Sequence, residues 1–324
     1  MEKGQKVQQV SSDRVRGALV GGAVGDALGV PYEFGATPFT GEGEMIGGGP
    51  FGFPAYSWSD DTAQLYAIAR AAADHGDLRQ ESALDDIANG FAEWFRSPEC
   101  LDCGIQTSAN LQAVGFPTTA EQMRTFAVHQ HEYSGRTAGN GSLMRTAPVA
   151  LPYLDDPEAL VEAAFTVAEL THFDPLNGQA CALWCLAIRS AIATGERPDL
   201  RAGLPYLADE DVRAFWDARI EEAETQDLGL FEASNGYVVV ALQAAWAAIV
   251  QTPVPADNPQ GHLVDALNAA IGIGNDTDTV AAIAGSLLGA MWGESAIPAE
   301  WREKVYGWDS TATGLGDLAG QIVG

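Results

Sequence analysis

Residues 274–285 read GNDTDTVAAIAG, which places two carboxylates, each followed by a hydroxyl, directly before an apolar run. The apolar side chains that follow recur with helical spacing, at Val280, Ile283, Ala284, Leu287, Leu288 and Met291. The pattern therefore predicts that a loop turns into a helix between Asp276 and Thr279. Gly272 and Gly274 give this loop the freedom to turn sharply.

The two carboxylates of this segment admit two interpretations. One of them can be a helix N-cap that accepts hydrogen bonds from the free backbone N–H groups of the first turn. Capping does not explain the second carboxylate, because it adds charge to an end that is already capped. Carboxylate and hydroxyl oxygens that converge on one point suit a hard cation such as Mg²⁺ or Ca²⁺.

A second oxygen-rich cluster, Ser59-Asp60-Asp61-Thr62, also opens an apolar helical pattern. If the two clusters face each other across one pocket, four carboxylates repel one another and stay partly protonated without cations. Two divalent ions would neutralise them, so a two-metal site is the economical hypothesis.

The composition of the chain limits its partners. Its 324 residues are 47% hydrophobic, which is enough for one sizeable core near the upper limit for a single domain. The formal net charge of −27, from 44 acidic and 17 basic residues, repels extended nucleic acid and anionic membranes. A solubility-adapted surface explains most of this charge, which does not identify the reaction.

The four cysteines predict free thiols. Cys100 and Cys103 form a single CxxC without a second pair at zinc spacing, and Cys181 and Cys185 lie one helical turn apart in an apolar run. The N-terminus has no apolar signal segment, and no apolar run approaches membrane-spanning length. We therefore expect a reduced, cytoplasmic protein without a membrane partner.

Helical patterns dominate the chain. They recur at about 13–28, 60–72, 84–95, 160–168, 178–194, 209–225, 235–250 and 262–271. The sequence does not contain several segments in which apolar and polar residues alternate, so a sheet is not expected. We predict a flexible N-terminus over residues 1–12 and one compact all-α domain over 13–324, a single-domain helical bundle with a Gly- and Pro-rich loop at about 35–57.

Several other polar residues have both a structural and a functional interpretation. Glu33 in a loop is ordinarily solvated surface, and Asp26 inside an apolar helix needs a partner, as a capping group or behind a functional site. Asp102 alone means little. Gly139–Arg145 is either a plain turn or a phosphate-binding loop that uses backbone N–H groups and Arg145. His172 lies where Pro175 is expected to stop a helix.

Taken together, these stretches resemble the ADP-ribosylglycohydrolase family, the group of the dinitrogenase reductase activating glycohydrolases. Five segments match in the family's order and span nearly the whole chain, and the last is the most specific. They are Gly17–Phe34, Trp58–Thr62, Gly139–Pro148, Thr171–Pro175 and Gly274–Gly289.

The resemblance implies an all-α fold with two Mg²⁺ or Mn²⁺ ions in a central cleft. The metal ligands it implies are Ser59, Asp60, Asp61, Asp276, Asp278 and Thr279. The catalytic candidates are Glu33, Asp102, Asp61 and Asp276. The candidates for substrate binding are Asn140, Gly141, Ser142, Met144, Arg145, His172, Asn235 and Tyr237. Asn275 stands where relatives often have glycine, which is expected to affect the approach to the ribose.

By the same resemblance, the expected activity is metal-dependent removal of ADP-ribose from protein side chains. Asp102 resembles an aspartate of arginine-type members, which favours an N-glycosidic bond to arginine. The partner is then an ADP-ribosylated protein or conjugate. Other linkages (serine, O-acetyl-ADP-ribose or a nucleobase) and a non-catalytic ADP-ribose-binding or immunity protein remain alternatives. The sequence leaves the oligomeric state, the target protein and the choice between Mg²⁺ and Mn²⁺ open.

Overall fold

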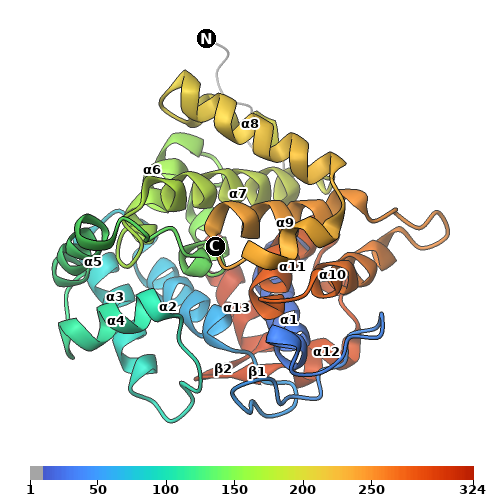
Figure 1. The fold of residues 1–324 in the computed structure, drawn as a ribbon, viewed down its shortest axis with the longest axis horizontal. Helices are drawn as coiled ribbons and strands as arrows, with labels where there is room; N and C mark the ends of the chain where they lie inside the picture. Colours follow the sequence, from blue (N-terminus) through green and yellow to red (C-terminus); the bar gives the residue numbers. More distant parts are fainter. Residues whose placement is uncertain (1–9) are drawn as a thin grey trace.

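Two glycine-rich helices pack closely in antiparallel directions at the centre of the molecule (Figure 1). They are α1, Ser12–Gly29, and α11, Thr277–Trp292. A Cβ atom at Gly17, Gly21 or Gly25 would collide with the α11 backbone, so the small residues at four-residue spacing are what allow this contact. The pairing brings the C-terminal end of α1 beside the N-terminal end of α11.

The computed structural model describes residues 10–324, and most of these residues lie in helices. The remaining helices are α2 Asp60–His75, α3 Glu81–Phe95, α4 Ile105–Val114, α5 Ala120–Ser134, α6 Pro157–Ala168, α7 Pro175–Thr194, α8 Glu210–Thr225, α9 Val238–Gln251, α10 His262–Ile273, α12 Ala299–Lys304 and α13 Ala312–Val323. Short 3₁₀-helical segments, among them Val30–Gly35, Asn140–Ser142 and Ala147–Tyr153, connect several of them. The strands β1, Tyr306–Gly307, and β2, Ser310–Thr311, form one short antiparallel pair.

The all-α prediction is confirmed, and each of the eight predicted helical segments corresponds to a helix, although α9 begins at Val238, three residues after the predicted start at 235. Helices α4, α5, α12 and α13 were not predicted. Helix α5 buries only Ala120, Met123 and Ala127, so its apolar face is too small to stand out in the sequence. The polar helix α8 lies at the edge of the molecule and buries only Trp216, Ile220 and Ala223 (Figure 1).

Two boundaries differ from the expectations. Helix α6 ends at Ala168, and Pro175 begins α7 rather than stopping the preceding helix. Its missing N–H suits the first helical turn, where Asp174 caps the helix by accepting a hydrogen bond from Leu176 N at 3.0 Å. Of the predicted flexible segment 1–12, residues 1–9 lie outside the described residues, and Ser12 already belongs to α1.

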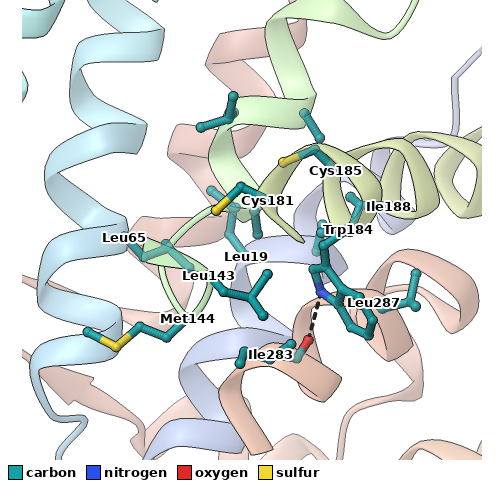
Figure 2. Close-up of a cluster of buried hydrophobic side chains, with 14 of the residues drawn as sticks. Leu19, Leu65, Leu143, Met144, Cys181, Trp184, Cys185, Ile188, Ile283 and Leu287 are labelled. Carbon is teal, nitrogen blue, oxygen red and sulfur yellow. Dashed lines mark hydrogen bonds between the residues drawn. The ribbon is translucent and has the colours of Figure 1, made fainter. Parts of the chain in front are cut away.

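The core joins α1, α2, α7 and α11 (Figure 2). Trp184 on α7 is buried and donates a hydrogen bond from Nε1 to the carbonyl oxygen of Ile283 on α11 at 3.2 Å. Cys181 and Cys185 are buried beside it, which confirms them as core thiols, and all four cysteines are free. Among residues 10–324, no helix combines the length and apolarity needed to cross a bilayer.

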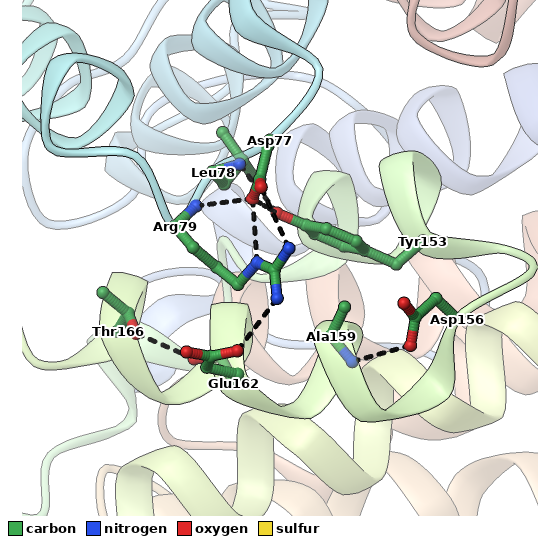
Figure 3. A network of polar contacts seen from close by, with 8 residues as sticks. All are labelled: Asp77, Leu78, Arg79, Tyr153, Asp156, Ala159, Glu162 and Thr166. Carbon is green, nitrogen blue, oxygen red and sulfur yellow. Dashed lines mark hydrogen bonds and ion pairs between the residues drawn. The ribbon is translucent and has the colours of Figure 1, made fainter.

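A polar network ties the turn between α2 and α3 to the segments that follow Gly139–Arg145, the Gly139 loop (Figure 3). Asp77 accepts hydrogen bonds from Arg79 Nε at 2.9 Å and from the hydroxyl of Tyr153 at 2.8 Å. Arg79 also donates to Glu162 on α6 at 2.9 Å. The Arg79 guanidinium holds the pKa of Asp77 well below its usual range. This network lies outside the cleft described next.

Candidate active site

The junction of α1, α2 and α11 opens into a cavity of about 820 Å³ that contains most of the predicted site residues. Its acidic lining comes from segments far apart in the chain: Glu33, Asp60, Asp102, Asp276 and Asp278. Asn140, Gly141, Met144, His172 and Thr279 also line it. The two oxygen-rich helix starts identified in the sequence therefore share one cleft.

Asp26 on α1 orients the first of these helix starts. Its Oδ1 accepts a hydrogen bond from Ser59 N at 2.9 Å, and its Oδ2 accepts from Thr62 N at 3.0 Å and from Thr62 Oγ1 at 2.6 Å. Asp26 thus caps α2 from a neighbouring helix, as one of the two sequence interpretations proposed. Because Asp26 already accepts from the backbone N–H groups of Ser59 and Thr62, Asp60 and Asp61 are not needed as caps.

Two groups of carboxylates come within metal-binding reach of one another, with the ligand atoms of each group inside 4.8 Å. One group is Asp26, Asp61 and Asp278, and the other is Glu33, Asp276 and Asp278. Asp278 belongs to both groups and so joins the α2 side of the cleft to the Glu33 side. Asp60 lies on the same cleft wall, where its Oδ2 accepts from Gly104 N at 3.3 Å.

Burial and mutual repulsion perturb the titration of these acids. Desolvation first, and neighbouring carboxylates second, raise the pKa values of Asp61 and Asp278 well above the usual aspartate range. For Asp60, desolvation and Asp102 have the same effect. Desolvation, followed by the charge of Asp276, raises the pKa of Glu33 to about 9. The metal-free site is therefore short of positive charge.

An asparagine network positions the second helix start. Asn140 Nδ2 donates to Asp276 Oδ2 at 2.7 Å and to the carbonyl oxygen of Asn235 at 3.0 Å. Asn275 adopts a left-handed backbone with φ of 60°, and its Nδ2 donates to Asn235 Oδ1 at 2.7 Å. Asparagine tolerates this left-handed conformation better than most residues other than glycine. Its side chain is held by Asn235 and does not line the cleft.

Four predicted substrate-binding residues lie outside the cleft lining. Ser142 accepts a hydrogen bond from Asn177 Nδ2 at 2.8 Å, and Arg145 is only 1% exposed, which corrects the expectation that these two side chains line the cleft. Asn235 is buried behind Asn140. Tyr237 is 38% exposed beside Gly236, which does line the cleft.

Comparison with known proteins identifies the family. Residues 7–324 match the family model described as ADP-ribosylglycohydrolase. The chain belongs to the ADP-ribosylglycohydrolase family. Membership in this family makes it a hydrolase of ADP-ribose linkages.

Named relatives of this glycohydrolase align over most of its length. It is 30% identical over 299 residues to ADP-ribosylarginine hydrolase Tri1 of Pseudomonas putida (strain GB-1), covering 90% of this chain and 74% of the relative. It is 30% identical over 298 residues to ADP-ribosyl-[dinitrogen reductase] glycohydrolase of Rhodospirillum rubrum, covering 90% of each. A solved structure titled "ADP-ribosylglycohydrolase-related protein complex" matches with a TM-score of 0.67 and 26% identity, covering 96% of this chain and 97% of that one.

The residues of this glycohydrolase fit the divalent metal centre that the family implies. Among residues 10–324, no hydrogen-bond donor reaches Glu33 Oε2, Asp61 Oδ1 or Asp278 Oδ1, although all three oxygens are buried. Buried polar atoms without partners are rare in folded proteins. Hard cations prefer the carboxylate and hydroxyl oxygens that this site offers, so the donor set suits Mg²⁺, Mn²⁺ or Ca²⁺.

Sequence reasoning missed several lining residues of the glycohydrolase cleft. Arg136 is the one arginine or lysine among the described lining residues, and Tyr133, Phe34, Phe51 and Ile105 form an apolar rim. These residues come from loops, from the Val30–Gly35 segment, from the first residue of α4 and from the end of α5, where no periodic pattern singles them out. The position of Arg136, three residues before Gly139, was the only available signal.

Proposed function

We propose that this glycohydrolase releases ADP-ribose from arginine side chains of modified proteins by hydrolysing the N-glycosidic bond, with two divalent cations in the cleft. The observation that carries the proposal is the convergence of two helix starts on one cavity, which Asp60, Asp276, Asp278 and Asp102 line. Asp61 lies behind this lining, within metal-binding reach of Asp278. The Tri1 relatives are named as ADP-ribosylarginine hydrolases, which supports the arginine linkage.

The metal ligands we propose are the side chains at the two helix starts. They are Ser59, Asp60 and Asp61 on one side and Asp276, Asp278 and Thr279 on the other. When bound, the cations supply Lewis-acid charge that orients ribose hydroxyls and activates water. Mg²⁺ and Mn²⁺ both fit an oxygen-rich site, so the two are to be compared directly.

The protein side chains then act on the developing charge. Hydrolysis of the glycosidic bond passes through an oxocarbenium-like transition state with positive charge on the ribose. An ionised carboxylate near the anomeric carbon stabilises this charge, and we assign this role to Glu33, which lines the cleft. Asp61 and Asp276 are the further catalytic candidates, and we expect them to help position the attacking water.

Asp102 is the residue we place nearest the leaving guanidinium. Its Oδ1 accepts a hydrogen bond from Cys103 N at 2.7 Å, which orients the carboxylate on the loop before α4. A carboxylate pairs with guanidinium through directed hydrogen bonds. Desolvation raises the pKa of Asp102, which favours its holding a proton for the departing group.

Asp102→Asn should therefore reduce turnover of ADP-ribosyl-arginine by about 100-fold, the typical scale of acid–base catalysis, and affect serine-linked or O-acetyl-linked substrates less. Initial rates on the three substrates measure this difference. Glu99→Gln is the matched control, because Glu99 is exposed on the same loop. An equal loss on all three substrates would remove Asp102 as the selector of the linkage.

Arg136 is the cation that we place against the diphosphate of the substrate. The cleft is otherwise acidic, and a diphosphate needs compensating positive charge. Arg136→Ala should raise the KM for modified arginine by about tenfold and leave kcat within twofold, since it removes binding common to the ground and transition states. Steady-state kinetics at two salt concentrations measure this effect, with Arg197→Ala as the exposed control. An unchanged KM would place the diphosphate elsewhere.

A panel of ADP-ribosylated substrates tests the proposed function as a whole. Arginine-, serine- and O-acetyl-linked conjugates are incubated with the enzyme, with and without a chelator, and released ADP-ribose is quantified. We expect chelator-sensitive release that is fastest from arginine. Preference for another linkage would refute the arginine assignment, and ADP-ribose binding without release from any conjugate would indicate a non-catalytic binder.

A further inference from the structure

Arg145, at the end of the Gly139 loop, is one of the largest fully buried side chains and lies behind the cleft wall. Its guanidinium lies over the ring of Phe91 on α3, with Cζ 4.4 Å from the ring centroid. One terminal nitrogen, Nη1, donates to Gln64 Oε1 on α2. The other, Nη2, donates to Thr171 Oγ1 at 2.6 Å. The side chain is thus held on three sides by α2, α3 and the loop before α7.

Arginine has donors and no acceptor, so it dictates the direction of each hydrogen bond it makes. Gln64 must present its carbonyl oxygen to Arg145, and its amide nitrogen then faces the opposite way. That nitrogen, Nε2, donates to Asp60 Oδ2 at 3.3 Å. The buried arginine therefore determines that Gln64 turns its NH₂ group, and not its carbonyl oxygen, towards Asp60.

The loop that carries His172 meets the other terminal nitrogen of Arg145 through a hydroxyl, which has one proton to donate and can accept two hydrogen bonds. Thr171 Oγ1 accepts from Arg145, and the Thr171 hydroxyl lies 2.7 Å from His172 Nδ1. In residues 10–324 the Thr171 hydroxyl makes no hydrogen bond to an acceptor other than His172 Nδ1, so its single proton is directed there. This leaves the histidine proton on Nε2. The Nε2 edge lies against the Gly139 loop, where a Cβ atom at Gly141 would come within 3.1 Å, and His172 lines the cleft. Burial and the charge of Arg145 lower the pKa of His172 well below its usual value, so the ring is neutral.

We propose that Arg145 is a positioning residue that sets the donor–acceptor direction of two relays, through Gln64 to Asp60 and through Thr171 to His172. Through the first relay Gln64 donates a hydrogen bond to Asp60, and through the second His172 presents an Nε2–H donor to the cleft. The Asp60 relay matters for catalysis only if the proposed function holds, whereas the His172 relay can be measured in the metal-free protein without substrate.

The His172 relay is tested first by the tautomer in solution. The chain has five histidines, so long-range ¹H–¹⁵N spectra of ¹⁵N-histidine-labelled protein resolve each ring, with His172→Gln for assignment. We expect neutral His172 protonated on Nε2 in the wild type. Thr171→Val should abolish this preference, whereas the control Thr166→Val, whose hydroxyl donates within α6 (Figure 3), should leave it unchanged. Protonation on Nδ1 in the wild type would overturn the proposal.

The Asp60 relay is tested by metal affinity. Gln64→Met keeps the volume of the side chain and removes its donor, so Mn²⁺ affinity measured by calorimetry should fall about tenfold, the scale for loss of an outer-shell partner. The His172 tautomer should not change in this variant. Unchanged Mn²⁺ affinity would refute the relay to Asp60. If the wild type binds no Mn²⁺, the metal part of the proposed function fails, and the His172 tautomer alone decides the role of Arg145.

Discussion

Asp278→Ala is expected to abolish release of ADP-ribose, with a loss of at least 1,000-fold, on the order of a missing catalytic metal or electrostatic stabiliser. Asp278 is the one carboxylate shared by both acidic groups, so its removal disrupts both at once. The helices should remain formed, because Asp278 makes no cap in α11. The same variant should raise the melting temperature of the metal-free protein, since burial and repulsion destabilise the charged carboxylate.

Activity with 1 mM Mn²⁺ and thermal unfolding with chelator measure the two effects on one preparation. Asp265→Ala, at an exposed position on α10, is the matched control and should change neither quantity. The loss of activity together with a gain in stability separates a functional role from a structural one. Full activity, or a lower melting temperature with chelator, would contradict the assignment. Asp60→Ala and Asp276→Ala should likewise abolish metal-dependent release.

The metal-free protein should lose stability as the pH rises from about 4, the usual carboxyl pKa, towards 9. The folded-state pKa values of Glu33, Asp61 and Asp278 are raised, so the native state holds protons that the unfolded chain has released. Stability therefore falls with pH across this window. Saturating Mn²⁺ should oppose the fall, because it neutralises the carboxylates and binds only the folded state.

Melting temperatures between pH 5 and 9, with chelator and with Mn²⁺, test this expectation. We expect a decrease on the order of 5 °C with chelator, since a shift of one pKa unit is worth about 1.4 kcal/mol. The Asp77 network has the opposite sign, because its depressed pKa supports stability above pH about 4 and loses it only in stronger acid. Asp77→Asn should therefore leave the slope between pH 5 and 9 intact. A flat or rising profile with chelator would contradict the raised pKa values.

Local patterns carried the sequence predictions furthest. The helical spacing of the apolar residues after Asp61 and after Thr279 predicted α2 and α11, because a helix that buries one face must repeat apolar residues at that spacing. Adjacent carboxylates and hydroxyls at each helix start were visible for the same reason. Helix α4 and the rim residue Tyr133 carry no such signal, because the one is short and the other is exposed.

Arg145 shows where residue type alone misled. An arginine beside a glycine-rich loop suggests a phosphate ligand, but the side chain turns inward to Gln64 and Thr171. Its packing on Phe91 comes from a helix distant in the chain. Arg136, a less conspicuous neighbour of the same loop, lies on the cleft instead.

The sequence by itself determined the helical class, the two acidic helix starts and the family, because these depend on residues close together in the chain. Only the tertiary structure decided that the acidic starts share one cleft, that Asp26 caps a helix other than its own, and that Arg145 lies behind the wall. The reason is that α1 and α11, which lie about 250 residues apart in the sequence (Thr277 and Gly29 differ by 248 positions), pack against each other. Which side chains meet across that contact depends on packing between distant segments, which local patterns do not encode.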